Sequence, residues 1–518
     1  MDHSAEAPRR GPLAAVAGAA AALLGAGAGE LGAALLAPAS SPFAVVGGAL
    51  IDAAPAWAKD TAIAWFGTSD KIALLTGIGI VTLLLSALLG LAELRLRHVG
   101  ATGFAAAGLV VALIAPTRAD AAALAWLPAL LAGVVAAVTA SRLVRMLRAE
   151  MTGDGEGAAR AGIDRRRFLA WAAGSAAAGV LATVVGAVGR AGSTAVNTVR
   201  EALRLPRPAT PAPPIPAGAT LDVPGLTSLI TPNDEFYRID TALVVPTVDP
   251  SEWRLRIHGM VEQEVTLTWD ELLALPLVES AATLSCVSNE VGGDLVGNAV
   301  WLGHPIRELL ARARPSADAD MVLSRSVDGF TAGTPLEALT DGRDALLAVG
   351  MNGQPLPLAH GFPVRMVVPG LYGYVSATKW VTELEVTRFD RARAYWTDRG
   401  WAERGPIKLQ SRIDVPREGR AVGTGDTVIA GVAWQPGTGV SAVEVQIDDG
   451  PWQRADLASA ISRDTWVQWR LPWRAEKGDH DIRCRAIGAD GKTQIEQAAP
   501  PAPDGATGWH RIRVSVGG

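Results

Sequence analysis

Cysteine is nearly absent from this 518-residue chain, whose only two are Cys286 and Cys484. Two distant cysteines do not form a disulfide framework, and CxxC and CxxCH motifs are missing. A zinc ribbon, a covalently attached haem and thioredoxin-like chemistry therefore have no support. Blocks of like charge are also missing and the formal net charge is only −5, so nothing indicates a nucleic-acid partner.

Apolar residues make up 49% of the chain, and they are concentrated in residues 11–190. A helix needs roughly 20 apolar residues to span a bilayer. A segment at 43–66 contains Asp52, Lys59 and Asp60, and charges are costly within a span, so we predict that it is interfacial. We therefore predict a transmembrane region over residues 1–150 with four spans, at 13–37, 72–93, 101–117 and 121–140.

Basic residues predict the orientation of these spans, because cytoplasmic loops carry an excess of Lys and Arg. One cluster precedes the first span, one follows the second and one follows the fourth. All three are cytoplasmic only if residues 43–66 do not cross. The clusters consist of Arg9 and Arg10; Arg95, Arg97 and His98; and Arg142, Arg145 and Arg148.

Residues 163–192 predict a fifth span that is preceded by a run of arginines. Arg165, Arg166 and Arg167 are followed by Phe168 and an apolar run. This order resembles a twin-arginine export signal, which lets a folded domain cross the membrane. Alternatively, the arginines only anchor the span on its cytoplasmic side. Both interpretations predict a multi-pass plasma-membrane protein whose remaining residues are extracytoplasmic.

Histidine is missing from the predicted spans, and a haem within the membrane normally needs a histidine pair. The seven histidines are His3, His98, His258, His304, His360, His480 and His510. We therefore predict no haem, and we expect the membrane half to act as an anchor or a docking surface.

The rest of the chain predicts a linker and two outer domains. Residues 193–219 include the Pro-rich stretch 205–218, which favours an extended spacer. Residues 220–400 mix strand-like and helix-like patterns and predict an α+β domain. Residues 401–518 predict a β-sandwich, because short alternating strands recur between Gly, Pro and Asp turns. Cys484 lies in one of these strands, where a small apolar residue suits the core.

Cys286, in TLSCVSNEVGG (283–293), has three possible roles. Free cysteine is often a core residue. A nucleophilic cysteine needs a positioned base, and the sequence does not identify one. As a metal ligand it would act as a thiolate, and a single thiolate suffices only if a cofactor supplies the other ligands. Composition and spacing leave all three roles open.

Several long motifs resemble the sulfite oxidase family of molybdopterin enzymes. They cover roughly residues 220–518 and begin with TPNDEFYRIDTALVVP (231–246). The segment around Cys286 resembles the family's molybdenum-ligating segment, and MNGQPLP, HGFPVR and VPG follow between residues 351 and 370. The late WHRIRV (509–514) resembles part of the family's immunoglobulin-like dimerisation domain. The resemblance implies a molybdopterin-binding domain at 220–400 and a possible homodimer through residues 401–518.

The resemblance also implies roles for individual residues. Cys286 falls where the family's thiolate binds molybdenum. His360 and Arg365 fall where the family holds the pterin and its phosphate. Ser376 and Lys379 match the family's closing Ser-x-Lys segment, which is one residue longer here. The remaining implied cofactor contacts are Phe236, Tyr237, Arg238 and Asp328.

The chain departs from the family at the substrate. Sulfite oxidases have an arginine pair directly after the cysteine loop, whereas this chain has Glu290 and Val291. Sulfite is a dianion that needs fixed positive charge, so the sequence argues against sulfite. We expect oxygen-atom transfer to or from another small molecule, for which neutral S- and N-oxides are candidates. The predicted catalytic residues are Cys286, Tyr374 and Glu290. The candidates for the substrate rim are Tyr374, Tyr395, Arg399 and Trp401.

Electrons must also be exchanged. The His-Pro-Gly-Gly motif of the family's cytochrome b5-like domain is missing, so we expect a separate partner, a cytochrome or a quinone-linked carrier. The alternative is a membrane-anchored binding module that keeps the fold without turnover. Glu290 favours that alternative, since it stands in place of an anion-binding arginine.

Overall fold

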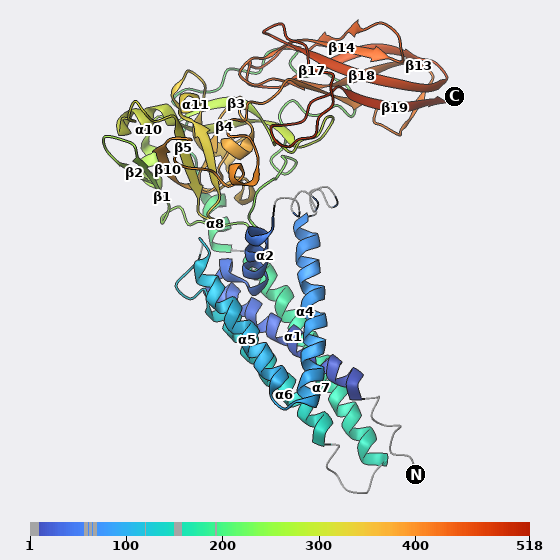
Figure 1. Cartoon of the computed structure of the whole chain (residues 1–518). Coiled ribbons are helices and arrows are strands. Elements are labelled where there is room, and N and C mark those ends of the chain that lie inside the picture. The colour runs from blue at the N-terminus through green and yellow to red at the C-terminus, as the bar shows by residue number, and fades with distance from the viewer. Residues whose placement is uncertain are drawn as a thin grey trace. The chain divides into compact units, whose positions relative to one another are not determined.

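The structure is a computed structural model that describes residues 10–55, 58, 61, 65, 70–119, 121–149, 158–191 and 194–517. The chain forms two compact units (Figure 1). One consists of Met1–Asn197 with Thr241–Pro246, and the other of Thr198–Asp240 with Thr247–Gly518.

The first unit is a helical bundle. In the part that the structure describes, its α-helices include α1 (Arg10–Leu36), α2 (Pro42–Ala53), α4 (Asp70–Arg95), α5 (Val99–Ile114), α6 (Leu127–Ala149) and α7 (Ala158–Ala191). Within the described ranges, five segments are long and apolar enough to cross a membrane, judged by length and composition: Arg10–Leu36, Lys71–Arg95, Val99–Thr117, Leu127–Arg148 and Arg166–Val188. The predicted 43–66 segment overlaps α2, which begins at Pro42 and has only 12 residues. Arg9, Lys59 and Asp60 lie outside the described residues.

Helix α1 lies against α4, α6 and α7 through small residues. A Cβ added at Gly18 would lie 1.9 Å from the Ser86 carbonyl oxygen, and one at Gly27 would lie 2.4 Å from the Gly179 carbonyl oxygen. Such close approach of helix backbones is typical of membrane proteins. The hydrophobic effect does not drive helices together in lipid, and small residues allow the close packing that does. Large apolar side chains on α4 and α7 remain exposed, for example Leu84 at 62% and Leu181 at 65%.

The boundary between the two units falls within α8 (Thr194–Ala202), because the second unit begins at Thr198. The Pro-rich residues that follow lie along a strand of this unit. The Ala209 amide donates to the Leu277 carbonyl oxygen at 2.7 Å, and Thr210 pairs with Val278. The backbone is extended, but it is packed against the sheet over this stretch.

Two sheets and three short helices form the region between residues 247 and 400. The first sheet has the order β2-β1-β10-β5-β6 and the second contains β3-β4-β7-β8 with β9 beside β7. Helix α9 follows a strand directly, because Thr268 and Glu271 form a capping box. The elements are β1 (Arg254–Gly259), β2 (Val265–Thr268), α9 (Trp269–Ala274), β3 (Val278–Ser285), β4 (Val296–Pro305), α10 (Ile306–Ala313), β5 (Met321–Ser326), β6 (Thr331–Pro335), α11 (Leu336–Thr340), β7 (Leu346–Met351), β8 (Gln354–Pro355), β9 (Arg365–Val367) and β10 (Val381–Thr387).

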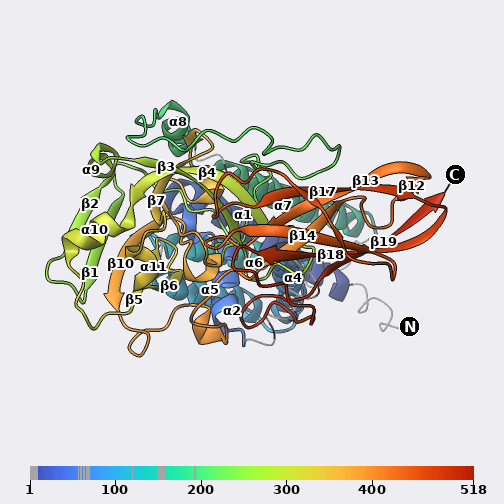
Figure 2. The same cartoon turned by 90° about the horizontal axis from the view of Figure 1, so that it is seen from above.

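The C-terminal region is β-rich (Figure 2). Its strands form two sheets that contribute residues to one apolar core. Trp469 and Ile429 of one sheet and Cys484 of the other are fully buried in this core, so the predicted core position of Cys484 is confirmed. One sheet contains β11 (Gln410–Val415), β13 (Gly425–Trp434), β16 (Asp456–Leu457) and β17 (Val467–Ala475). The other contains β12 (Ala421–Gly423), β14 (Val440–Ile447), β15 (Gln453–Arg454), β18 (Gly478–Gly488) and β19 (His510–Gly517).

Candidate functional site

Cys286 opens the loop between β3 and β4, defined here as the Cys286 loop (residues 286–295). The Cys286 amide donates to the Leu295 carbonyl oxygen at 2.9 Å, and the Leu295 amide donates to Asn289 Oδ1 at 2.8 Å. Within the loop, the Gly293 amide bonds to the Glu290 carbonyl oxygen at 2.9 Å. Gly292 has φ +79°, which fits the third position of a type II turn and favours glycine. The loop therefore has a closed, well-defined conformation.

Cys286 is buried, with 8% of the residue exposed, and its surroundings act on the pKa of its thiol in two directions. Burial raises the pKa of the Cys286 thiol, because it disfavours the charged form. Hydrogen bonds from the Ser288 amide and hydroxyl, the Lys379 charge and the Val287 amide act to lower that pKa. These groups are the ones that a thiolate needs as partners. The site can thus hold the anionic sulfur once a cation compensates for burial.

Aromatic rings pack beside β4, the strand that follows this loop. Phe236 stacks on Tyr237, with 5.2 Å between ring centroids, and it meets the rings of Trp301 and His360 edge-on at 5.7 and 5.6 Å. Burial and the neighbouring Cys286 raise the pKa of Tyr237 far above its usual range, so its hydroxyl stays protonated. A Cβ added at Gly373 would lie 4.0 Å from that hydroxyl.

Arg365 is buried at the start of β9, with only 4% of the residue exposed. Its Nη1 donates to the His360 carbonyl oxygen at 3.2 Å and its Nε to the Met366 carbonyl oxygen at 3.3 Å. Its guanidinium also lies 5.0 Å from the centre of the Trp301 ring. Burial lowers the pKa of Arg365 to about 10, so the side chain remains a cation at neutral pH.

His360 is 5% exposed, and its Nε2 lies 3.0 Å from the Asn233 carbonyl oxygen, to which it donates. Its Nδ1 is therefore an acceptor, and this buried atom has no hydrogen-bond partner among the described residues. Burial, assisted by Arg365 and Lys379, lowers the pKa of His360 to about 4. The ring is neutral at physiological pH, and an acceptor atom is available for a ligand.

Lys379 is held by an acidic residue that sequence reasoning missed. Its Nζ donates to Asp240 Oδ2 at 2.9 Å and to the Ala359 carbonyl oxygen at 3.0 Å. Arg238 Nε donates to the same Asp240 oxygen at 2.9 Å, although its own side chain is 38% exposed. Burial lowers the pKa of Lys379 to about 8 despite this carboxylate. Asp240 stands two residues after Arg238, within the segment that contains Phe236 and Tyr237.

Three predicted site residues use their polar groups within the fold. The Tyr374 hydroxyl donates to the Ala402 carbonyl oxygen at 2.8 Å, and its ring packs on Trp401 at 5.9 Å. The fully buried Ser376 hydroxyl donates to the Tyr372 carbonyl oxygen at 2.9 Å. Asp328 Oδ1 accepts from the Phe330 amide at 3.2 Å, as a turn residue. A contact between any of these residues and a ligand would have to use an atom or lone pair that these hydrogen bonds do not engage.

Glu290 is exposed at the tip of the Cys286 loop. Its side chain therefore places a carboxylate at the surface of the loop that carries the candidate metal ligand. Tyr395 and Arg399 are both partly buried and contact each other, with the guanidinium 3.6 Å from the ring centre.

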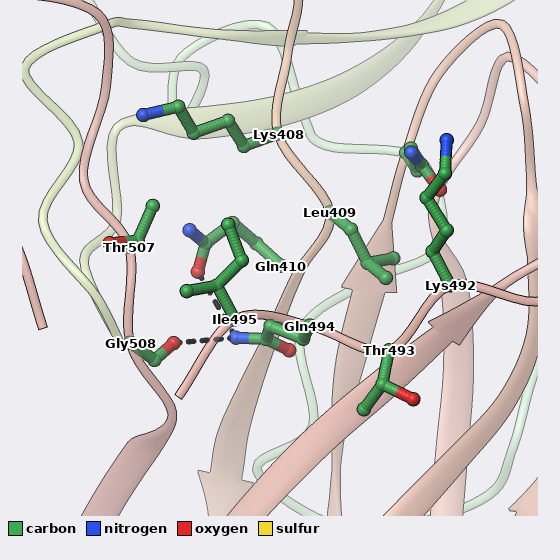
Figure 3. A pocket seen from close by; sticks show the side chains of 10 residues that line it. Lys408, Leu409, Gln410, Lys492, Thr493, Gln494, Ile495, Thr507 and Gly508 are labelled. Carbon is green, nitrogen blue, oxygen red and sulfur yellow. Dashed lines mark hydrogen bonds between the residues drawn. The ribbon is translucent and has the colours of Figure 1, made fainter. Parts of the chain in front are cut away.

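A separate hollow of about 160 Å³ lies in the C-terminal region (Figure 3). Within its lining, Gln494 Nε2 donates a hydrogen bond to the Gly508 carbonyl oxygen at 2.7 Å. Lys408 and Lys492 are ion-paired with Asp504 and Asp490, each at 2.9 Å. None of the predicted site residues lines this hollow, whose lining consists of Lys408, Leu409, Gln410, Gln435, Lys492, Thr493, Gln494, Ile495, Thr507 and Gly508.

The lowered pKa of His360 predicts a pH-dependent stability. The unfolded chain takes up the proton near pH 6.5 and the folded chain only near pH 4. The free energy of unfolding should therefore be unaffected by His360 above pH 6.5 and should fall as pH drops towards 4, by up to about 3 kcal/mol. Denaturant unfolding of the cofactor-free chain at several pH values measures this slope.

The His360→Gln variant should flatten that slope, because glutamine does not titrate. His480→Gln is the matched control. Asp448 raises the pKa of His480, so the stability that His480 contributes is present at low pH and is lost as pH rises. An unchanged acid slope in His360→Gln would contradict the assignment of a neutral buried ring.

Comparison with known proteins found a matching domain family and several relatives. The family described as oxidoreductase molybdopterin binding domain matches residues 242–396. Mitochondrial sulfite oxidase of Rattus norvegicus is 31% identical over 343 residues, which cover 56% of this chain and 62% of that protein. The catalytic subunit MsrP of the protein-methionine-sulfoxide reductase of Burkholderia mallei is 33% identical over 262 residues, which cover 45% of this chain and 74% of that protein.

Among solved structures, the sulfane dehydrogenase SoxCD from Paracoccus pantotrophus matches with a TM-score of 0.50 and 22% identity over 56% of this chain and 82% of that chain. This likeness concerns the fold. The relatives, the matched domain and the motifs around Cys286 and His360 lead to one assignment: the chain belongs to the sulfite oxidase family of molybdopterin oxidoreductases.

Proposed function

We propose that this protein is a membrane-anchored molybdopterin-dependent oxidoreductase that transfers an oxygen atom to or from a small neutral substrate. One observation carries the proposal. Cys286 offers a buried sulfur with partners for its anionic form. No group of three His, Cys, Asp or Glu side chains that could hold a metal ion occurs in the part of the chain that the structure describes. A single thiolate suits a metal whose other ligands come from a cofactor.

The surrounding side chains fit a phosphorylated pterin. Such a group needs cationic forks and acceptors, because it carries phosphate oxygens and N–H groups. Arg365 is a buried cation, and His360 Nδ1 is a buried acceptor without a partner among the described residues. Lys379, with Asp240 behind it, adds a second cation. The residues that would hold the cofactor are Phe236, Tyr237, Arg238, Asp328, His360, Arg365, Ser376 and Lys379, with Cys286 on the metal.

The protein's part in the reaction follows from these contacts. When bound, the molybdenum cofactor supplies the two-electron chemistry by which an oxygen atom is gained or lost. Cys286 holds and tunes the metal as a soft thiolate. His360 keeps one protonation state across physiological pH because its pKa is about 4. Arg365 and Lys379 fix the pterin, and the buried rings of Phe236 and Trp301 exclude water from it.

The substrate that we propose is an S-oxide or an N-oxide. Glu290 disfavours dianions at the loop surface, and the relative from Burkholderia mallei is named for methionine sulfoxide reduction. Assays with reduced viologen and methionine sulfoxide, dimethyl sulfoxide or an amine N-oxide test this. Faster turnover of sulfite than of all three would contradict it.

Replacing Glu290 by arginine should shift the preference towards sulfite. A hydrogen bond to a charged group contributes roughly 1.5–3 kcal/mol, which corresponds to roughly a 10- to 100-fold lower KM for sulfite. Glu290→Gln is the matched control and should give a smaller change, because it removes only the repulsion. Equal sulfite kinetics in the wild type and both variants would place Glu290 outside the substrate path.

Membrane attachment and partners complete the proposal. The five apolar helices would anchor the protein in the plasma membrane, with the basic clusters inside and residues 163–192 acting as a twin-arginine-like signal and fifth span. The catalytic domain would then be extracytoplasmic, and its electrons would be exchanged with a separate cytochrome or quinone-linked carrier. The C-terminal region would be an immunoglobulin-like sandwich that forms a homodimer. A purified protein that reduces quinone unaided would contradict the separate carrier.

A further inference from the structure

The C-terminal region reaches the Cys286 loop through a buried arginine. Arg412, on β11, donates from Nη1 to the Gly293 carbonyl oxygen at 2.8 Å. Its other nitrogens are also engaged, because Nε donates to Asp414 at 2.6 Å and Nη2 to Thr227 at 2.8 Å. The side chain is only 10% exposed. Because three hydrogen bonds hold the Arg412 guanidinium in place, it also restrains the position of the Gly293 carbonyl group.

A histidine of β19 covers the same turn. His510 Nδ1 accepts from the Ile413 amide at 2.9 Å, so the orientation of the ring is set. The opposite ring edge lies against Gly292: a Cβ added there would be 2.2 Å from His510 Cδ2. Gly292 already needs glycine for its φ of +79°. The turn is thus fixed by the backbone conformation of Gly292, by the hydrogen bond from Arg412 and by the packing of His510 on Gly292.

The strand that leads into the loop is braced by the same region. The Thr283 amide donates to the Asp464 carbonyl oxygen at 2.9 Å, and the Trp466 amide donates to Thr283 Oγ1 at 2.8 Å. Thr283 lies three positions before Cys286. Both ends of the segment that carries Cys286 therefore contact residues of the C-terminal region.

We propose that Arg412 and His510 are positioning residues that set the conformation of the Cys286 loop and thereby the position of the Cys286 sulfur. The C-terminal region then contributes to the metal site as well as to stability. This inference rests on the proposed function, in which Cys286 binds the metal, although the contacts with the loop do not depend on it. Interactions behind a metal ligand orient the ligand and tune the metal.

Two readouts test it on the full-length chain. The first is the rate at which iodoacetamide alkylates Cys286 in cofactor-free protein under native conditions. Arg412→Met and His510→Ala should raise that rate roughly tenfold, since local opening becomes easier without these contacts. Arg412→Lys should be intermediate, because it keeps the charge beside Asp414. Arg513→Met, on the exposed face of β19, should match the wild type.

The second readout is the electron paramagnetic resonance spectrum of Mo(V) in protein purified with its cofactor. Arg412→Met and His510→Ala should shift the g-values at unchanged molybdenum content, whereas Arg513→Met should not. If folded Arg412→Lys, Arg412→Met and His510→Ala show wild-type alkylation rates and g-values, the inference is wrong while the proposed function stands. If the wild type holds no molybdenum, the proposed function fails, and the alkylation rates alone then decide whether these residues hold the loop.

Discussion

Replacing Cys286 by serine is expected to lower turnover by at least ~100-fold while the protein stays folded. Loss of groups behind a metal ligand already costs roughly 10- to 100-fold in affinity or activity, so loss of the ligand itself should cost more. Serine has nearly the size of cysteine, and the loop contacts through the Cys286 amide and carbonyl do not involve the side chain. Turnover with an S-oxide substrate and thermal unfolding, measured on the same preparation, check both statements.

The matched control for this variant is Cys484→Ser. Cys484 is fully buried in the C-terminal core, and its sulfur lies 3.3 Å from the Ser411 hydroxyl. That substitution should affect stability, because it buries another hydroxyl, but should leave the activity of the folded protein unchanged. If Cys484→Ser and Cys286→Ser lost activity equally, the loss would follow from destabilisation and not from the metal.

Replacing Arg365 by methionine is the second change with a large expected effect. It removes a buried cation that binds two backbone carbonyls and lies on Trp301. Each hydrogen bond from a charged group to a bound phosphate contributes roughly 1.5–3 kcal/mol, so the pterin content of purified protein should fall roughly 10- to 100-fold.

Arg365→Lys tests whether geometry matters in addition to charge. Lysine keeps the charge but does not offer the planar fork that bonds bidentately to phosphate, so its pterin content should remain below that of the wild type. Arg325→Met serves as the control, because Arg325 is an exposed arginine paired with Glu383. Wild-type pterin content in Arg365→Met would remove this arginine from the cofactor site.

Much of the fold could be predicted from the sequence, because local patterns define strands and helices. The short alternating strands predicted within residues 401–518 include β19 at His510–Gly517, and the apolar stretch 72–93 corresponds to a helix at Asp70–Arg95. The predicted span 121–140 is displaced, since α6 runs from Leu127 to Ala149. Composition does not separate an apolar turn from an apolar helix, and residues before Leu127 form turns.

Contiguous motifs predict Cys286, His360 and Arg365 as candidate site residues, and all three are buried in the structure. Contacts between distant segments are not predictable in this way: Lys379 pairs with Asp240 across 139 positions, and Arg412 reaches Gly293 across 119. No local periodicity signals such pairs, because they depend on how the sheets pack. For the same reason, the bond between the Tyr374 hydroxyl and the Ala402 carbonyl oxygen could not be foreseen.

The most direct test of this account is the molybdenum and pterin content of the full-length protein purified from its own host. We expect about one molybdenum and one pterin per chain, and a thiolate signature in the metal's spectrum that disappears in Cys286→Ser. Folded wild-type protein without molybdenum would contradict the account. Cys286 would then be a core residue, and a membrane-anchored binding module would be the better description of the molecule.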